Sequence, residues 1–456
     1  MMGRKDDYQS RMEFIDLNTF VPSNHILRQI NEKIDFSFIY NKMEMYYSKH
    51  GRKSLDPVLL FKMLLIGYLY NVDSERELEQ EVNLNIAYRW FLGLDLTDPV
   101  PDHSTFSQNR RRRFKDSTVF QEIFDHIVKL CMEKGLVTGE VIVTDSTHIK
   151  ASASKSKVEK VTVEKTPSQY LNTLELEAKK IEKELEEKRK ETGTKKRGRK
   201  PKGPSTETIS VVKTDSDAGV LSRPGKPTGP HYLAHTSIDT KNGIIVDIHP
   251  SPGNINDCEP FVERLKVIQD KFELDIKSVG VDRGYDTTPI HHGLKTLEIT
   301  GYISPIKYDN AFDTTSYRDF IYNREKDTYT CPNQKELCFT HLMSKGEHFY
   351  KTYSAKTKDC KVCPFREKCF GKTASKRTIS RPIAHELLEE NIQRTKTNEY
   401  KLVQKLRRVW CEGSFGTMKI KHNLYKTYKR GIEKIHEQCL FSALALNLKR
   451  IIKVID

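Results

Sequence analysis

The spacing of apolar residues divides the chain into a helical first part and a strand-rich second part. Up to about residue 136 the apolar positions follow a helical period, and residues 58–66 are apolar on nearly every side, as in a helix at the centre of a bundle. Asp56 and Pro57 mark the start of that helix, because an acid serves as N-cap and proline suits the first turn. We therefore predict an N-terminal helical domain over residues 1–136.

Two short apolar runs in the second part each lead to a single carboxylate. The β-branched residues 141–143 are followed closely by Asp145, and residues 278–281 by Asp282. Such runs favour buried strands, so we expect both acids at strand ends. One acid in this position usually caps a turn, and only the repetition of the pattern favours a shared site.

Between the two acids the pattern is that of a mixed sheet. Strands are predicted at 231–238 and 243–249 with a hairpin signal between them, and a helix is predicted at 259–270. This order of elements predicts an α/β fold whose sheet has mixed strand directions. Residues 150–165 are polar, and we expect them to form turns.

Two charged segments interrupt the sheet pattern at about 155–225. A helix with Glu and Lys on its other faces carries a short coiled-coil seam that needs a partner. The seam residues are Leu171, Leu174, Ala178, Ile181 and Leu185. The basic run 195–202 follows and contains Arg197 and Arg199. It is either a flexible linker or an arm that contacts the minor groove of DNA.

Composition and charge limit the class of partner. The chain has 456 residues, enough for two or three domains, and a net charge of +15, which indicates a polyanionic partner. Nucleic acid fits better than a membrane, because no apolar span is long enough to cross a bilayer. The nine cysteines are an odd number, and together with the lack of a secretory signal they favour a reducing cytoplasm.

The segment 102–114 is the first candidate for contact with DNA. A Ser or Thr cap is expected before a short helix whose side chains are of the types that bind base edges and phosphates. These are Gln108, Asn109, Arg110, Arg111, Arg112 and Arg113. The alternative is a solvated basic face. The region as a whole has the character of a helix-turn-helix domain.

Cysteines are the main feature of a polar insertion over residues 307–400. Cys360 and Cys363 have the two-residue spacing of a metal knuckle. With Cys331 and Cys369, or with Cys338 in reserve, they could complete a structural zinc site of four thiolates. The alternative is a set of half-buried thiols without metal. We expect zinc to stabilise the insertion, which has few apolar residues for a core of its own.

A third acid lies in the last segment. In a helix, Arg408 and Glu412 are four residues apart and share a face, and Lys419 lies near that face seven residues on. The alternative is a surface ion pair. Basic and aromatic residues alternate from 421 to 430, which suits a groove for a DNA backbone. A final helix at 439–454 has an apolar face and is expected to pack on the core.

These acids carry a resemblance to a known family. Asp145, Asp282 and Glu412 resemble the Asp-Asp-Glu triad of insertion-sequence transposases with an RNase H-like catalytic core. Arg408, Glu412 and Lys419 fit the spacing of the Tyr-Arg-Glu-Lys signature, and Lys405 stands at its tyrosine position.

Other segments extend the resemblance to nearly the whole chain. Residues 102–106, Gly253-Asn254 with Asp257, and Asp282 with Gly284-Tyr285 look like motifs of the same transposases. The cysteine insertion is similar to that of the insertion sequence eleven-eighty-two group. The resemblance implies an RNase H-like mixed-sheet domain over 137–306 and 401–456, with residues 307–400 inserted into it.

The resemblance also implies a function. The chain is expected to bind the terminal inverted repeats of its element and to catalyse metal-dependent DNA cleavage and strand transfer. Asp145, Asp282 and Glu412 would hold Mg²⁺ or Mn²⁺, and Arg408 and Lys419 would orient Glu412 or bind phosphate. We expect double-stranded DNA as partner, a homodimer on DNA and a cytoplasmic, nucleoid-associated protein. The alternatives are a DNA-binding regulator derived from a transposase and a simple metal-dependent nuclease.

Overall fold

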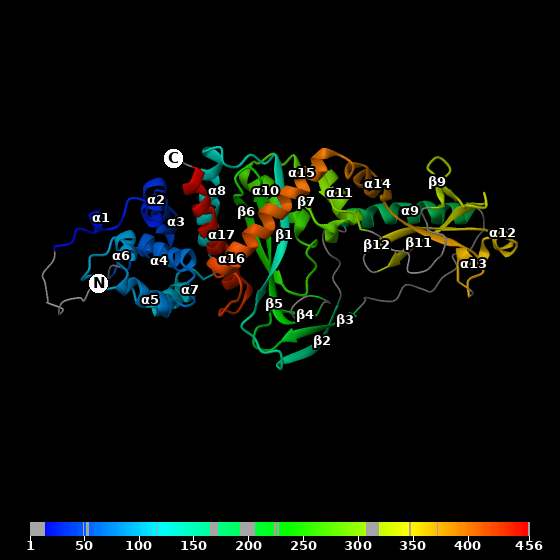
Figure 1. Ribbon diagram of the computed structural model, residues 1–456. Coiled ribbons are helices and arrows are strands. Elements are labelled where there is room, and N and C mark those ends of the chain that lie inside the picture. The colour runs from blue at the N-terminus through cyan, green and yellow to red at the C-terminus, as the bar shows by residue number, and fades with distance from the viewer. Residues whose placement is uncertain are drawn as a thin grey trace, which may run out of the picture. The chain divides into compact units, whose positions relative to one another are not determined.

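The computed structural model forms two compact units (Figure 1). The first takes in Met1–Val137, Lys241–Pro250 and Gly413–Asp456, and the second Thr138–Thr240 and Ser251–Glu412. The structure describes residues 14–48, 50–51, 54–115, 117–164, 172–191, 206–222, 225, 228–306, 319–345, 348–371 and 373–454. Among these residues, no helix is long and apolar enough to cross a membrane.

Helices make up the first unit, as the sequence predicts for its N-terminal part. They are α1 (Leu17–Phe20), α2 (Ile26–Lys33), α3 (Phe38–Met43), η1 (Glu44–Tyr46), α4 (Pro57–Leu69), α5 (Glu75–Leu84), α6 (Ile86–Leu92), α7 (Ser104–Arg112), α8 (Val119–Glu133), α16 (Gly413–Lys421) and α17 (Ile432–Val454). The start of α4 is as predicted, since the Asp56 carboxylate accepts hydrogen bonds from Val58 N and Leu59 N. Every residue of α4 from Leu60 to Leu69 except Lys62 is buried.

The last helix completes this helical unit. α17 packs against α2, α4 and α8, and the ring of Phe441 lies 5.2 Å from that of Phe61 and 5.3 Å from that of Tyr68. From the sequence, α17 is expected to pack on the core of the sheet domain. An apolar face shows that a helix packs but does not identify the surface that it packs on.

A mixed sheet is the centre of the second unit, and the predicted α/β fold class is confirmed. Its described strands are β1 (Val141–Lys150), β2 (Val158–Glu164), β3 (Thr206–Val212), β4 (Gly219–Leu221), β5 (Gly229–Asp239), β7 (Ser278–Val281) and β8 (Thr300–Ile303), with β6 (Ile245–Pro252) holding residues of both units. They follow the order β2-β3-β4-β5-β1-β7-β8. β1 is antiparallel to β5 and parallel to β7, and β7 is parallel to β8. Antiparallel strands on one side of β1 and parallel strands on the other fit an RNase H-like core.

Two expectations about this sheet need correction. β1 does not end at Asp145 but continues to Lys150, because β5 pairs with it over its whole remaining length. Residues 150–165 are not only turns, because β2 forms there and pairs with β3. In both places the partner strand lies far along the chain, so the local polarity could not predict the pairing.

Helices surround the sheet of the second unit. They are α10 (Phe261–Phe272), η3 (Arg283–Tyr285), α11 (Thr288–Thr296), α14 (His385–Arg394), α15 (Asn398–Arg407) and η5 (Arg408–Glu412). α15 packs against β1, β7 and β8. The Gln404 side-chain amide donates to Val281 O at 3.0 Å and to Tyr302 O at 2.7 Å, which fixes α15 to the neighbouring strands β7 and β8.

The cysteine-bearing insertion has a sheet of its own. β9 (Ile321–Asn323), β10 (Thr328–Thr330), β11 (Glu336–Lys345), β12 (His348–Ser354) and β13 (Thr378–Pro382) are antiparallel, and α12 (Thr357–Lys361) and α13 (Arg366–Cys369) are short helices between β12 and β13. Tyr329, Leu337 and Tyr353 are buried together in its core. The expectation that the insertion lacks a core is therefore wrong, because aromatic residues supply the area that aliphatic residues do not.

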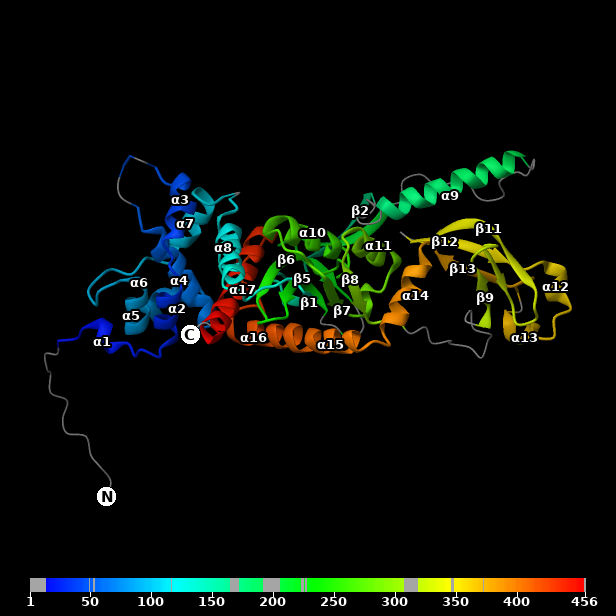
Figure 2. The ribbon, with the colours of Figure 1, turned by 90° about the horizontal axis from the view of Figure 1, so that it is seen from above.

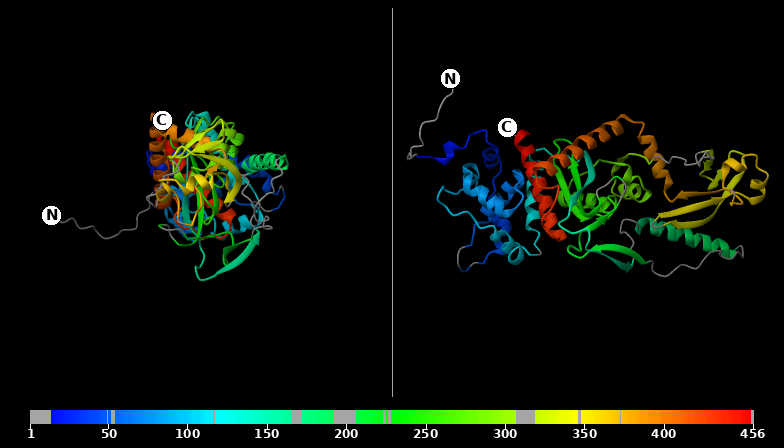
Figure 3. Two further views of the ribbon diagram at one scale, coloured as in Figure 1. Left: turned by 90° about the vertical axis from the view of Figure 1, so that its right-hand side faces the viewer. Right: turned by 60° about the horizontal axis from the view of Figure 1, so that its bottom comes forward.

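The charged helix finds its partner in this second sheet. α9 (Asn172–Glu191) lies beside β11 and β12 (Figures 2 and 3). Ala178 of the predicted seam is buried against Ile383, and Ile181 packs on the same cluster. Ala178 and Ile181 of the seam thus pack on a sheet rather than on a second helix. Leu171 and the side chain of Leu174 lie outside what the structure describes.

Candidate active site

Two of the predicted acids lie in matching positions on neighbouring strands. The parallel pairing of β1 and β7 ends at Val143 and Gly280. Asp145 and Asp282 each follow two residues later, so the same number of residues leads from the last pair to each carboxylate. Because side chains alternate between the faces of a sheet, this register brings the two acids side by side at the end of β7.

The pKa of Asp145 also indicates that Asp145 and Asp282 are neighbours. Burial raises the pKa of Asp145 to about 6, against the opposing effects of the Ser146 backbone N–H and Arg407. Asp282 and Asp257 also raise the pKa of Asp145, as like charges do at short range. Three carboxylates therefore share one small region of the second unit.

A buried tyrosine belongs to the same cluster. The pKa of Tyr285 is raised well above its ordinary value, first by burial and then by Asp145, Asp257 and Asp282. The Asp282 carboxylate accepts from Gly284 N at 2.8 Å and begins η3. A Cβ on Gly284 would lie 3.0 Å from Asp282 Oδ1, so glycine permits this tight turn. The sequence marks Asp257, Gly284 and Tyr285 only as parts of family motifs.

Glu412, the third predicted acid, ends a π-helical turn. η5 packs against β1 and β5, so the element that carries Glu412 adjoins the strand that carries Asp145. Glu412 is exposed. A π turn closes hydrogen bonds between residues five apart and is frequent at functional sites. The sequence predicts an α-helix here, in which residues four apart share a face.

Next to the π turn, Arg407 contacts the acid cluster in place of the predicted Arg408. Arg407 Nη1 donates to Asp145 Oδ2 at 2.7 Å, and the Arg407 side chain is 13% exposed. Arg408, the predicted residue, is exposed. The sequence does not indicate Arg407. Arg407 and Arg408 are adjacent, and in an α-helix the four-residue spacing to Glu412 favours Arg408. Gln404 gives a reason for the observed register, since it anchors α15 three residues earlier.

The arginines of the predicted basic helix α7 form two groups. Two of them contact other side chains of the protein, and two are exposed to solvent. Arg110 donates through Nε and Nη2 to the Glu437 carboxylate, both at 2.7 Å, and pairs with Glu75. Arg113 stacks on the Tyr47 ring at 4.0 Å. Arg111 and Arg112 are exposed. The charge of Arg110 is therefore balanced within the protein by Glu437 and Glu75, and contact of Arg110 with DNA stays a prediction.

The other predicted DNA-contacting residues are placed as follows. Gln108 and Asn109 form hydrogen bonds to the preceding turn, Gln108 to Ser104 Oγ and Asn109 to Thr105 O. Arg197 and Arg199 lie outside the described residues. Lys419 lies on α16 of the first unit.

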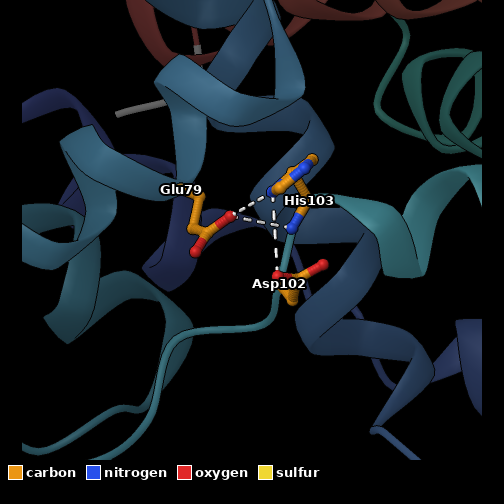
Figure 4. A group of neighbouring side chains, drawn as sticks. All are labelled: Glu79, Asp102 and His103. Atoms are coloured by element: carbon orange, nitrogen blue, oxygen red, sulfur yellow. Dashed lines mark hydrogen bonds and ion pairs between the residues drawn. The ribbon is translucent and has the colours of Figure 1, made fainter.

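Among the described residues, the group whose ligand atoms have the spacing of a metal site is not the predicted triad but Glu79, Asp102 and His103 (Figure 4). The ligand atoms of Glu79, Asp102 and His103 lie within 4.8 Å of one another. Glu79 Oε2 lies 2.7 Å from His103 Nδ1 and accepts from His103 N at 2.9 Å, while Asp102 accepts from Ser104 N at 2.7 Å. These bonds fix the start of α7. They replace the predicted Ser or Thr cap, because Ser104 is already the first helical residue.

The predicted zinc ligands lie near one another in the insertion. The pKa of Cys369 is raised by burial first and then by Cys360, Cys363 and Cys331, with Arg377 opposing. Cys331 Sγ accepts from Lys335 N at 3.4 Å. Within the described part of the chain, no three thiols lie within 4.8 Å of one another. Cys338, the reserve ligand, is exposed.

Comparison with known families identifies the class of protein. The family described as "Transposase domain (DUF772)" matches residues 15–112, and "Transposase DDE domain" matches residues 330–452, which include Glu412. Two parts of the chain therefore match transposase families, and the second match is to a DDE domain. A transposase DDE domain implies a divalent metal ion such as Mg²⁺ or Mn²⁺. No curated protein matches the chain significantly.

Solved structures of transposases also align with the chain. A piggyBac transposase synaptic complex with hairpin DNA aligns over 94% of this chain and 74% of that one, at 9% identity and a TM-score of 0.34. A Mos1 transposase paired-end complex with the left transposon end aligns over 56% of this chain and 61% of that one, at 10% identity and a TM-score of 0.17.

Proposed function

We propose that this transposase binds the terminal inverted repeats of its own element, cleaves the DNA at their ends and joins those ends to a target. Asp145, Asp282 and Glu412 form the catalytic triad of this proposal. The observation that carries it is the matching register of Asp145 and Asp282 at the end of β7. The packing of η5 on β1 supports the third position.

The residues of the cluster fit a divalent metal. Mg²⁺ and Mn²⁺ prefer carboxylate oxygens, and the repulsion of Asp145 by Asp282 and Asp257 is the electrostatic condition that a cation relieves. Asp145, Asp282 and Glu412 would hold the metal. Bound there, divalent ions supply activation of the attacking oxygen and stabilisation of the leaving oxygen in phosphodiester cleavage.

The chain's own residues keep the cluster assembled. Arg407 supplies a positive charge to Asp145, and Gln404 holds α15 so that Arg407 reaches that carboxylate. For Arg408 and Lys419 the proposed roles remain to orient Glu412 or to bind DNA phosphate. Two protomers, one at each end of the element, would act together on double-stranded DNA.

Cleavage of a terminal-repeat duplex in Mg²⁺ tests the triad. Asp145→Ala, Asp282→Ala and Glu412→Ala should each abolish cleavage and leave duplex binding largely intact. Asp275→Ala is the matched control in the same unit, because the Asp275 side chain is 75% exposed and pairs with Lys277, which is 66% exposed. Cutting at the wild-type rate by a triad variant would remove that residue from the proposal.

The products decide between the proposed function and its alternatives. Joined ends on a target plasmid support a transposase that completes strand transfer. Cleavage without joining would instead indicate a simple metal-dependent nuclease. Specific binding of the repeats by the wild-type chain, with no cleavage in Mg²⁺ or Mn²⁺, would indicate a regulator.

We also propose that Cys331, Cys360, Cys363 and Cys369 bind one structural zinc ion, with Cys338 as the reserve ligand. The support is that Cys331, Cys360 and Cys369 belong to one core cluster and that Cys363 acts electrostatically on Cys369, since thiolates are preferred zinc ligands. Elemental analysis of protein purified under reducing conditions should find about one zinc per chain, by the stoichiometry of a four-ligand site. Cys363→Ser should lose the zinc, whereas Cys258→Ser, outside the insertion, should keep it. Wild-type protein that binds no zinc would refute this.

A further inference from the structure

The first unit contains a large groove that the proposed triad does not use. It has a volume of about 870 Å³ and lies where the turn after α4, the helix α7 and the loop between α16 and α17 meet. All of its lining residues belong to the first unit. The volume is in the range of sites for small organic ligands.

The lining is strongly basic. Its basic residues are Arg110, Arg111, Lys419, Lys426, Lys429, Arg430 and Lys434, and its acidic residues are Asp73 and Glu75. A concave surface lined by charges of one sign attracts an oppositely charged ligand. The composition therefore favours a polyanion.

A buried ion-pair network forms the floor of the groove. Glu437 lies beneath it and pairs with Arg110 at 2.7 Å and with Lys429 at 3.0 Å, and Arg110 also pairs with Glu75. Burial alone would raise the pKa of Glu437, but Lys429 and Arg110 lower it to about 2. These four charges balance within the protein, and Lys426 pairs with Asp73 at 2.9 Å. Arg111 and Lys434 of the lining are exposed, so they can contact the phosphates of a ligand.

The loop between α16 and α17 is held rigidly in an irregular conformation. Asn423 has a positive φ of 56°, and its side chain donates to Val72 O at 2.7 Å. His422 Nδ1 lies 2.7 Å from Tyr68 O, and Gln438 donates to Lys426 O at 2.8 Å. Buried polar side chains thus hold a loop that is neither helix nor strand, which is the expected construction of a binding loop.

This loop carries two exposed tyrosines into the lining. Tyr425 is 60% exposed and Tyr428 is 61% exposed. Tyr428 donates to Asp73 at 3.3 Å, and Lys426 Nζ lies 4.7 Å from the centre of its ring. Exposed aromatic rings between basic side chains are the combination that binds single strands, because bases stack on the rings while the cations contact phosphates.

We propose that this groove binds single-stranded DNA, with phosphates against Lys434 and its basic neighbours and a base stacked on Tyr425. A duplex buries the faces of its bases, so only unpaired nucleotides can use the tyrosines. The inference rests on the proposed function, because staggered cleavage of the two strands at an element end leaves unpaired nucleotides that the groove can bind.

Binding of fluorescent DNA by the full chain without metal tests the groove. The probes are a single-stranded dT oligonucleotide, an abasic oligonucleotide with the same number of phosphates, and a duplex of equal length. Tyr425→Ala should weaken binding of the dT strand about 5- to 150-fold, the equivalent of one stacked base, and leave the abasic strand unaffected. Tyr425→Phe should restore binding, because stacking needs the ring and not the hydroxyl.

Two lysine variants distinguish binding in the groove from general attraction of DNA by positive charge. Lys434→Ala should weaken binding of both single strands, whereas Lys129→Ala, an exposed lysine of α8 outside the groove, should change neither. The proposal is overturned if Tyr425→Ala binds dT as the wild type does, or if the wild type binds the abasic strand equally well. Because no cleavage is measured, these results are independent of whether the triad cuts DNA.

Discussion

A single hydrogen-bonded ion pair, Arg407 with Asp145, shows how finely the candidate site depends on register. The carboxylate is 21% exposed and the guanidinium 13%, so neither charge is fully solvated. Asp145 also faces two further carboxylates. Removal of Arg407 leaves the Asp145 carboxylate near two other carboxylates without its positive partner. Removal of the exposed Arg408 should have little effect on stability.

We therefore predict that Arg407→Ala lowers the free energy of unfolding of the metal-free protein by about 1.5–3 kcal/mol, the value of a hydrogen bond to a charged group. Arg408→Ala should change it by less than about 0.5 kcal/mol. The chain has two tryptophans, and Trp410 lies on η5. Urea unfolding followed by Trp410 fluorescence in a Trp90→Phe background reports on this region.

Addition of Mg²⁺ should reduce the difference in free energy of unfolding between Arg407→Ala and the wild type, because the cation neutralises Asp145 in place of the arginine. Equal stabilities of the two arginine variants without metal would show that Arg407 contributes no more than a surface ion pair.

At this scale the sequence predicts acids better than their partners. Asp145 and Asp282 follow apolar strands, and that pattern is visible locally. Arg407, Asp257 and Tyr285 reach the cluster from separate elements, and their proximity depends on a π turn and on packing that no local pattern contains.

Elements show the same division between local and distant causes. The apolar α4 and the strand β7 are predicted well, because their periodicity and caps are local. The length of β1 and the existence of β2 depend on β5 and β3. The role of α7 depends on a carboxylate of α17, 327 residues away.

The buried pair of Arg110 and Glu437 gives a prediction for α7. Arg110→Ala should destabilise the first unit by about 3–5 kcal/mol, because it breaks a buried network. Arg112→Ala, an exposed arginine on the same helix, should have an effect within about 0.5 kcal/mol. Denaturant unfolding of the full chain, followed by circular dichroism, measures both.

The pH dependence of the stability difference between the wild type and Arg110→Ala tests whether the charge of Glu437 causes that difference. The folded pKa of Glu437 is about 2, below its ordinary 4.5. A lowered pKa stabilises the fold above pH 4.5, and this contribution is lost as the pH falls from 4.5 toward 2. The gap between wild type and Arg110→Ala should therefore shrink in this window. A gap that stays constant would mean that packing, not charge, explains the loss.

For the whole molecule, charge predicts how DNA binding responds to salt. With a net charge of +15, the affinity for a terminal-repeat duplex should fall steeply as salt rises, by a slope of about −0.9 for each neutralised phosphate. Replacement of Arg111 and Arg112 by Ala should make the slope shallower by about 0.9 for each of them that contacts phosphate. Anisotropy titrations over a salt series measure the slope, and a flat profile would exclude electrostatic binding.

Domain organisation is the property that the sequence predicts least completely. The fold class follows from the alternation of strands and helices. The assignment of residues 413–456 does not, because an apolar helix can pack on any apolar surface. The structure groups this segment with the N-terminal helices.

That grouping has a consequence for synthesis on the ribosome. The helices α2, α4 and α8 precede the sheet domain in the chain, yet α17, which packs against all three, follows it. Until it emerges, Arg110 has no Glu437 to pair with, and the rings of Phe61 and Tyr68 lack Phe441. The helical unit therefore completes its core only after the intervening sheet domain has been synthesised, so that assembly of the groove is delayed until α17 has been translated.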